Sequence, residues 1–206
     1  MSMNSAIKNY IFDLGNVLVR FDPLALTAPY AQDTAVRELI SETAFDRLYW
    51  DRLDLGTITD AELKEACHAR LHPSLHDLCD TVYDHWVENL PLIPGMRELL
   101  LDIKAKGKRI FLLSNISIGF TEQYPQVPLL QELLSHFEGL VFSGPLGIVK
   151  PSKEIFLHLL DTYGLKPEET MFIDDSAKNI AGAQAVGIAG YHFDGDAAKL
   201  REYLNI

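Results

Sequence analysis

Four polar residues that lie far apart in the sequence have complementary chemistry. Asp13, Ser114 and Asp175 each come at the end of a short apolar run, and Lys150 comes just before a helical pattern. A carboxylate such as Asp13 can attack phosphorus and form an acyl-phosphate, which divides one difficult displacement into two easier ones. The hydroxyl of Ser114 can hold phosphate oxygens, and Lys150 supplies a positive charge. These residue types therefore indicate phosphoryl chemistry.

The balance of charge among these residues predicts a divalent cation. Asp13, Asp174, Asp175 and a phosphate dianion are all negative, and Lys150 alone is positive. Without a divalent ion, at least one carboxylate would take up a proton rather than stay charged. Mg²⁺ prefers one or two carboxylates together with water and phosphate oxygens, which suits Asp13 with Asp175. We therefore expect Mg²⁺ as the cofactor.

Three neighbouring residues each have two interpretations. Asn115 follows Ser114, so it either helps to bind the phosphate or is an ordinary turn residue. Asp174 is expected to support the site from behind Asp175 rather than to bind the metal directly. Asn179 lies one helical turn beyond Asp175, so its amide either orients that carboxylate or faces solvent. Asp174 and Asn179 are thus expected to support the metal site.

Five apolar runs are predicted to form a parallel sheet that would bring these residues together. The runs are rich in Ile, Val, Phe and Leu without alternation, as expected of strands buried on both faces. They span Asn9–Leu14, Arg109–Ser114, Gly139–Ser143, Thr170–Asp174 and Gly187–Phe193. Helical patterns cover 95–106, 152–163 and 176–186, and each ends just before a glycine. Strands alternating with helices predict an α/β fold, a parallel sheet sandwiched by helices, with ligands at the carboxyl ends of the strands.

Residues 22–90 interrupt this alternation. Between Asp13 and Gly107 lie far more residues than the roughly 30 that a βαβ unit needs. The interval contains 14 acidic and 5 basic residues, a net charge of −9 out of −11 for the whole chain. Its helical patterns are Thr34–Thr43, Phe45–Leu53, Thr59–Leu71 and Leu75–Glu88. We interpret it as an inserted all-helical cap, which gives a core of 1–21, a cap of 22–90 and a second core segment of 91–206.

Aromatic residues of the insertion are expected to form its own core. These are Trp50, Tyr83 and Trp86, any of which could also stack on a sugar ring. Because the insertion would cover the strand ends, changes at Trp50, Arg52 or Tyr83 are expected to alter substrate preference. Changes at Ser114 should depress the reaction of every substrate alike.

The composition is that of an ordinary soluble globular protein. Of 206 residues, 48% are hydrophobic and 23% are charged, and no apolar run approaches the roughly 20 residues that span a bilayer. The acidic net charge disfavours nucleic acid and anionic membranes as partners. Cys67 and Cys79 are expected to be reduced thiols, which together with the absence of a signal peptide predicts a cytoplasmic location. The expected partner is a small phosphorylated metabolite, bound by a monomer or weak homodimer.

The order of the motifs resembles that of the haloacid dehalogenase superfamily. That pattern has Asp ending the first strand, Ser or Thr after the next core strand, then Lys, then an Asp pair that opens a helix. The insertion after the first motif corresponds to the superfamily's helical cap, and the resemblance covers essentially the whole chain. Asp13-Leu14-Gly15-Asn16-Val17 and the stretch 52–59 are similar to a bacterial subgroup that includes sugar-1-phosphate (α-D-glucose 1-phosphate) phosphatases.

The resemblance implies a Rossmann-like core and a role for each motif. Asp13 would be the nucleophile, with Ser114 and Lys150 as further catalytic residues that bind the phosphoryl group. Asp13, the Gly15 carbonyl and Asp175 would bind Mg²⁺. The implied activity is that of a phosphatase working through an aspartyl-phosphate intermediate.

Gly15 departs from the pattern, because phosphatases of the superfamily usually have a general acid, Asp, at that position. General acid–base catalysis contributes about 10² to 10⁴ in rate. Without it the leaving oxygen would depart as an anion, which favours sugar 1-phosphates and acyl phosphates unless Asp22, His76 or His85 replaces the acid. Two alternatives stay open: a non-hydrolytic protein that binds phosphate ligands, and a metal-free dehalogenase. The Asp174-Asp175 pair disfavours the dehalogenase, since those enzymes lack it.

Overall fold

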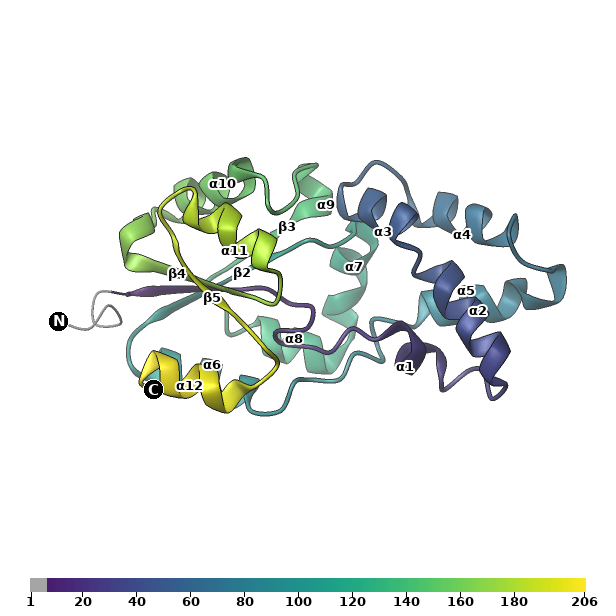
Figure 1. The fold of residues 1–206 in the computed structure, drawn as a ribbon, viewed down its shortest axis with the longest axis horizontal. Helices are drawn as coiled ribbons and strands as arrows, with labels where there is room; N and C mark the ends of the chain where they lie inside the picture. Colours follow the sequence, from purple (N-terminus) through teal and green to yellow (C-terminus); the bar gives the residue numbers. More distant parts are fainter. Residues whose placement is uncertain (1–6) are drawn as a thin grey trace.

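A five-stranded parallel sheet forms the centre of the molecule (Figure 1). The computed structural model describes residues 7–206. The strand order is β3-β2-β1-β4-β5, and every neighbouring pair is parallel. The strands are β1 Asn9–Phe12, β2 Arg109–Ser114, β3 Gly139–Phe142, β4 Thr170–Asp174 and β5 Ala189–His192. The predicted parallel α/β architecture is confirmed.

Helices cover both faces of the sheet because alternate strand residues point to opposite sides. Phe12 and Leu112 pack with helices α6, α8 and α12 on one face, whereas Ile11 and Phe111 pack with α10 and α11 on the other (Figure 1). All four of these side chains are fully buried. The two edge strands are exceptions: β3 is half-buried on one face, and β5 has half-buried residues and an exposed His192. The prediction that all five strands are buried on both faces is therefore wrong for these two strands.

The helices of the core lie between and after the strands. Their bounds are α6 Met96–Ala105, α7 Ile118–Gln123, α8 Pro128–Leu134, α9 Ser143–Leu146, α10 Lys153–Tyr163, α11 Ala177–Gln184 and α12 Ala197–Leu204, with 3-10 turns η3 Tyr124–Gln126 and η4 Pro167–Glu169. The sequence patterns predicted α6, α10 and α11, but no element was predicted for 116–138 or for α12. Pro125 and Pro128 interrupt the helical pattern in 116–138, and each falls at the start of a new helical segment, where proline is tolerated.

Residues 23–84, which follow β1, form a group of helices beyond the carboxyl ends of the strands (Figure 1). They are α1 Pro23–Thr27, α2 Thr34–Ala44, α3 Arg47–Asp54, α4 Asp60–His68 and α5 His76–Asp84, with the 3-10 turn η2 Pro73–Leu75. Side chains in the sequence fix where several of these helices begin: Asp33 caps α2, Asp46 caps α3, and Thr59 with Glu62 forms a capping box at α4. The four predicted helices are confirmed. None of the helices in residues 7–206 is long and apolar enough to cross a membrane.

Strand β1 lies at the point where the chain connections diverge to the two sides of the sheet. Its register pairs Phe12 with Leu112 of β2 and with Ile173 of β4. The next residue, Asp13, donates its backbone N–H to the Ile173 carbonyl at 2.9 Å. Asp13 therefore stands between the ends of β2 and β4, at the kind of switch point where ligands bind in open α/β sheets.

Candidate active site

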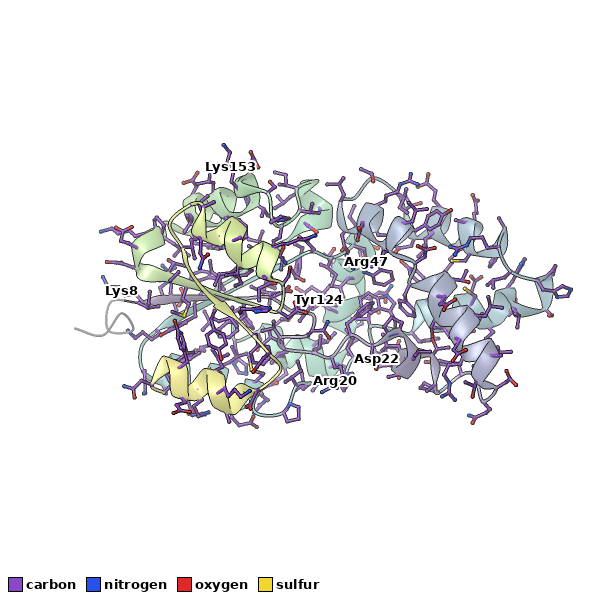
Figure 2. All side chains as sticks on the ribbon, in the orientation of Figure 1. Lys8, Arg20, Asp22, Arg47, Tyr124 and Lys153 are labelled. Atoms are coloured by element: carbon purple, nitrogen blue, oxygen red, sulfur yellow. The ribbon has the colours of Figure 1, made fainter. Side chains whose placement is uncertain are left out.

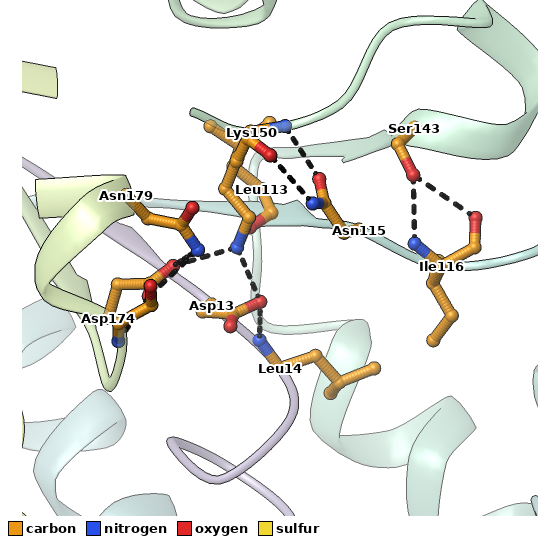
Figure 3. A network of polar contacts seen from close by, with 10 residues as sticks. Asp13, Leu14, Leu113, Asn115, Ile116, Ser143, Lys150, Asp174 and Asn179 are labelled. Atoms are coloured by element: carbon orange, nitrogen blue, oxygen red, sulfur yellow. Dashed lines mark hydrogen bonds and ion pairs between the residues drawn. The ribbon is translucent and has the colours of Figure 1, made fainter. Parts of the chain in front are cut away.

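Lys150 is the centre of the polar network at the carboxyl ends of the strands (Figure 3). Its side chain is 1% exposed, and its ammonium donates to three oxygens: Asp13 Oδ1 at 2.8 Å, Asp174 Oδ2 at 2.8 Å and the Leu113 carbonyl at 3.0 Å. An ammonium has three N–H donors, so all are used. Burial alone would lower the pKa of Lys150, but the two carboxylates outweigh it and raise this pKa above its ordinary value. Lys150 is therefore a fixed positive charge.

Asp13 holds its carboxylate in a fixed orientation within this network. Oδ1 accepts from both the Lys150 ammonium and the Leu14 backbone N–H, the latter at 2.7 Å. Within residues 7–206 the other oxygen, Oδ2, has no hydrogen-bond partner, so it is the oxygen free to react. Burial raises the pKa of Asp13, and the neighbouring Lys150 charge opposes that rise. The site thus presents one half of a buried carboxylate to its surroundings.

Asp174 is fully buried and fully occupied by neighbours. Besides Lys150, it accepts from the Ser176 backbone N–H at 2.7 Å and from the Asn179 amide, which lies 3.1 Å from each carboxylate oxygen (Figure 3). Neither interpretation of Asn179 is right, because its amide contacts Asp174 rather than Asp175 or solvent. Helix α11 begins at Ala177, so Asp175 lies outside the helix and the one-turn spacing does not apply.

Asp175 is half-buried beside this group. Burial and the adjacent Asp174 carboxylate raise the pKa of Asp175, while the Asn16 side chain opposes the rise. Oxygens of Asp13, Asp174 and Asp175 all lie within 4.8 Å of one another. A set of ligands made only of oxygen atoms at this spacing fits Mg²⁺, and the Gly15 residue lines the same space.

The side chains of Ser114 and Asn115, which were expected to bind phosphate, do not point freely into the cavity. The Asn115 side chain donates to the Lys150 carbonyl at 3.0 Å and accepts from the Lys150 backbone N–H at 2.8 Å (Figure 3). Because its amide is committed to positioning Lys150, a contact between Asn115 and a substrate would have to come from its backbone. Ser114 ends β2 and is 2% exposed, and it does not line the cavity next to Asn115.

A cavity of about 500 Å³ connects these residues to the helical insertion. Its floor includes Asp13, Gly15 and Asp175 from the sheet edge. Three aromatic rings, Phe21, Trp50 and Trp86, form a wall, with centroids 5.3 to 5.8 Å apart. The expected placement of Trp50 and Trp86 in the insertion's core is confirmed, and both also line the cavity.

Two other residues of the insertion, both expected to affect substrate preference, do not line the cavity. Tyr83 is buried and hydrogen-bonds Asp60, and neither Tyr83 nor Arg52 lines the cavity. Arg47 does line it, and Figure 2 shows Arg47 between the insertion and the sheet. Tyr83 is in the insertion's core, as expected. The structure gives no contact through which changes at Arg52 or Tyr83 would alter substrate preference, because successive residues of a helix point in different directions and these two point away from the cavity.

None of the three residues considered as replacement acids lines the cavity. Asp22 caps α1 by accepting from two backbone N–H groups. His76 stacks on His68 with ring centroids 4.1 Å apart, and His85 pairs with Glu88 on the surface. Asp54, at the end of α3, does line the cavity. The only signal for it in the sequence was its place in the stretch 52–59.

The chain is similar to known proteins over nearly its whole length. A family model for haloacid dehalogenase-like hydrolases matches residues 7–187. The chain therefore belongs to the haloacid dehalogenase-like hydrolase family and is a hydrolase. The superfamily expected from the motifs is thereby confirmed, whereas the sugar-1-phosphate subgroup stays a prediction.

Individual relatives support the same class. A sesquiterpene phosphatase of Aspergillus oryzae is 26% identical over 200 residues, which cover 97% of this chain and 96% of that protein. A phosphoglycolate phosphatase of Chromobacterium violaceum is 30% identical over 129 residues, covering 60% of this chain and 55% of that one. A haloacid dehalogenase family enzyme of Bacteroides thetaiotaomicron, solved with magnesium and inorganic phosphate, is 25% identical with a TM-score of 0.71, covering 94% and 98% of the two chains.

Proposed function

We propose that the protein is a magnesium-dependent phosphatase that hydrolyses a small phosphorylated metabolite through an aspartyl-phosphate on Asp13. The observation that carries this proposal is the buried network in which Lys150 fixes one oxygen of Asp13 and leaves the other free. Such a carboxylate is oriented for attack, and it needs no proton removed before it reacts. Relatives that are phosphatases, and a similar enzyme that binds magnesium and phosphate, support the same activity.

Each residue of the sheet edge has a separate role in the proposed reaction. Asp13 Oδ2 forms a bond to phosphorus while the bond from phosphorus to the ester oxygen breaks. The charge of Lys150 attracts the phosphoryl oxygens, although its three N–H groups are already used, and the backbone N–H of Asn115 donates to them. Ser114 is buried at the end of β2 and positions that N–H. Asp174 and Asn179 act through Lys150, because they hold its ammonium beside Asp13. Water then attacks the aspartyl-phosphate and releases phosphate.

Asp13, the Gly15 carbonyl and Asp175 would hold the magnesium ion, with Asp174 supporting them. When bound, the ion supplies positive charge that lets a carboxylate and a phosphate approach each other. Asp174 is the weaker candidate for direct binding since its oxygens already accept bonds from Lys150, Ser176 and Asn179.

The helical insertion, residues 22–90, acts as a cap over the sheet edge and decides which ester reacts. Two classes of substrate have support. A sugar 1-phosphate is favoured by the resemblance of 13–17 and 52–59 to sugar-1-phosphate phosphatases. An ester with an apolar organic group is favoured by the aromatic wall of Phe21, Trp50 and Trp86 and by the similarity to a sesquiterpene phosphatase.

A panel of phosphate esters assayed with Mg²⁺ tests the activity and separates the substrate classes. It should include sugar 1- and 6-phosphates, acyl phosphates and isoprenoid monophosphates. We expect hydrolysis that EDTA abolishes and that Mg²⁺ restores better than Ca²⁺, whose larger and looser shell misplaces the phosphate. Asp13→Asn is isosteric, so it should fold yet lose activity by several orders of magnitude. Full activity in excess chelator would support the metal-free dehalogenase, and phosphate binding without turnover would support a non-hydrolytic binding protein.

A further inference from the structure

The sheet edge has no buried side chain that is free to give a proton to the leaving oxygen: Lys178, which also lines the cavity, is exposed to solvent. Gly15 has no side chain, and Lys150 donates to three oxygens already. The two acidic residues that face the cavity floor, Asp13 and Asp175, have the proposed roles of nucleophile and metal ligand. A buried proton donor must therefore come from the other side of the cavity.

Asp54 is a buried carboxyl group on that other side. It is the last residue of α3, it lines the cavity and it is only 7% exposed. Its Oδ1 is buried without a hydrogen-bond partner, and within residues 7–206 no other buried side-chain oxygen or nitrogen is left in that state. An unsatisfied buried polar atom destabilises the folded protein, so a group kept in this state is a candidate for a catalytic role.

The backbone of Asp54 is fastened to the core, which fixes the carboxyl group relative to the active site. The Ser143 hydroxyl donates to the Asp54 carbonyl at 2.5 Å, and the same hydroxyl accepts from the Ile116 N–H at 2.9 Å. Two residues further on, Gly56 packs directly on the Gly144 backbone: a Cβ added to Gly56 would lie 2.3 Å from the Gly144 carbonyl oxygen. The end of α3 is thus joined to the loops that follow β2 and β3.

The surroundings of Asp54 favour its protonated form near neutral pH. Burial raises the pKa of Asp54 to about 7. The charged groups that act on it are Arg47 and Asp51 from its own helix, and Lys150 and Asp13 from the sheet edge; the two basic groups lower this pKa and the two acidic groups raise it. A general acid works best when its pKa lies close to the operating pH.

We propose that Asp54 is the general acid and base of this enzyme, in place of the residue that Gly15 lacks. While the bond from phosphorus to the ester oxygen breaks, the Asp54 carboxyl proton moves to that oxygen, which leaves as a neutral alcohol. The Asp54 carboxylate then takes a proton from the water that attacks the aspartyl-phosphate, and the bond between phosphorus and Asp13 breaks. Both carboxyl groups return to their starting states. The proposal rests on the proposed phosphatase function.

A series of phosphate esters with graded leaving-group pKa tests the proposal, measured as kcat/KM because this ratio reports the step in which the alcohol leaves. For the wild type we expect kcat/KM to depend only weakly on the leaving group. Asp54→Asn keeps the size of the side chain but has no acidic proton. It should lower kcat/KM by about 10² to 10³ for alkyl phosphates and by less than about threefold for the most acidic phenyl phosphates.

Three further measurements separate a catalytic role from a structural one. The fall of kcat/KM above pH 7 for alkyl esters should disappear in Asp54→Asn, since no acid is left to deprotonate. Asp84→Asn, which changes another carboxylate of the insertion that does not line the cavity, should behave as the wild type. Gly15→Asp in the Asp54→Asn background should restore alkyl ester hydrolysis, because a Cβ at Gly15 meets nothing within 4 Å and its φ is not left-handed.

The outcomes distinguish this proposal from the one on which it rests. A steep dependence on the leaving group in the wild type that Asp54→Asn leaves unchanged would overturn the role of Asp54 while the phosphatase activity stands. An Asp54→Asn variant that only raises KM, equally for all leaving groups, would also overturn it and make Asp54 a binding residue. Failure of the wild type with Mg²⁺ to hydrolyse even the most reactive phenyl phosphate would overturn both proposals.

Discussion

At the scale of single residues, the site depends on one buried cation shared by two carboxylates. Lys150 neutralises only part of the charge of Asp13 and Asp174, and all three side chains are nearly inaccessible to water. Removing one partner of a buried ion pair leaves an uncompensated charge, which costs far more than the pair itself contributes. The Lys150 ammonium therefore stabilises the fold, apart from the role proposed for it in the reaction.

Lys150→Met is expected to lower the free energy of unfolding at pH 8 by roughly 3 to 5 kcal/mol. The loss should shrink as the pH falls and the two carboxylates take up protons. Lys150→Met combined with Asp174→Asn should recover part of the lost stability at pH 8, because one of the uncompensated charges is gone. Urea unfolding at several pH values measures all three proteins. If the loss were the same at pH 4 and pH 8, it would come from packing rather than from charge.

Asp54 should change how the stability of the protein depends on pH, and this effect can be measured without any assay of catalysis. Because its pKa is raised to about 7 in the folded protein, from a value near 4 in an unfolded chain, the folded state holds the proton more tightly. The protonated Asp54 side chain contributes fully to the free energy of unfolding below about pH 4. This contribution is lost as the pH rises through 7 and the folded protein gives up the proton. Asp54→Asn, which stays neutral, should thus be more stable than the wild type at pH 8, by a few kcal/mol, with the gap closing towards pH 4.

Thermal unfolding across this pH range measures the difference. Asp51→Asn provides the control, since this carboxylate is on the same helix but is 61% exposed. An Asp54→Asn variant that is less stable than the wild type at pH 8 would contradict the inference that the carboxyl group is poorly solvated.

At the scale of secondary structure elements, the junction of α3 with α9 holds the insertion against the core. Gly56 has a left-handed φ of 69° and touches the Gly144 backbone, so any side chain there would be strained and would also clash. Gly107 has a similar φ of 71° but nothing within 4 Å of an added Cβ. The two glycines therefore differ in the contact and not in the backbone conformation.

Gly107→Ala should cost about 1 to 2 kcal/mol of stability, which is the penalty for a left-handed backbone. Gly56→Ala should cost a further 1 to 3 kcal/mol, roughly the penalty for overpacking. It should also lower kcat/KM for alkyl esters, because it moves Asp54 away from the sheet edge. Denaturant unfolding and kinetics on both variants test this. If the two substitutions lowered stability and kcat/KM equally, the contact between Gly56 and Gly144 would add nothing to either quantity.

Elements with a strong local pattern were predictable, and elements defined by their neighbours were not. The strands and the helices α6, α10 and α11 were found because apolar runs and helix-ending glycines are local features. Helices α7 and α8 were missed, since two prolines divide a short segment whose helical form depends on packing against the sheet. Strand β5 was placed correctly, but its position at the edge follows from the strand order.

At the scale of the whole molecule, the cavity lies between two parts with different tasks. Its floor contains Asp13, Gly15 and Asp175, and Trp50 and Trp86 of its wall come from the insertion, which holds −9 of the net charge of −11. Arg47 is an exception on that wall: it is a basic residue, it is 75% exposed and it pairs with Asp51 at 2.7 Å. Arg47 is therefore placed to meet a second anionic group on a substrate.

Arg47→Ala should change the preference between esters with and without a second anionic group by about 3- to 10-fold in kcat/KM. Arg52→Ala, on the same helix but outside the cavity, is the matched control and should leave the ratio unchanged. Ser114→Ala should depress all substrates by one factor. If Arg47→Ala also scaled every substrate alike, the insertion would act only as a lid.

The sequence by itself determined the class of fold and the residues of the sheet edge. A polar residue at the end of a buried strand is a local pattern, and parallel strands bring such ends to one edge whatever else the chain does. Asp13, Lys150 and Asp174 could thus be placed together from their positions on predicted strands and loops, and they do meet in the structure.

Only the tertiary structure decided which partner each side chain takes and what faces the nucleophile across the cavity. Asn179 contacts Asp174 rather than Asp175, and Asn115 holds Lys150. Asp54 reaches the site from an insertion whose orientation is fixed by contacts such as the one between Ser143 and Asp54, which are 89 residues apart. Such contacts depend on the angle at which one packed layer meets another, and local propensity contains no information about that angle.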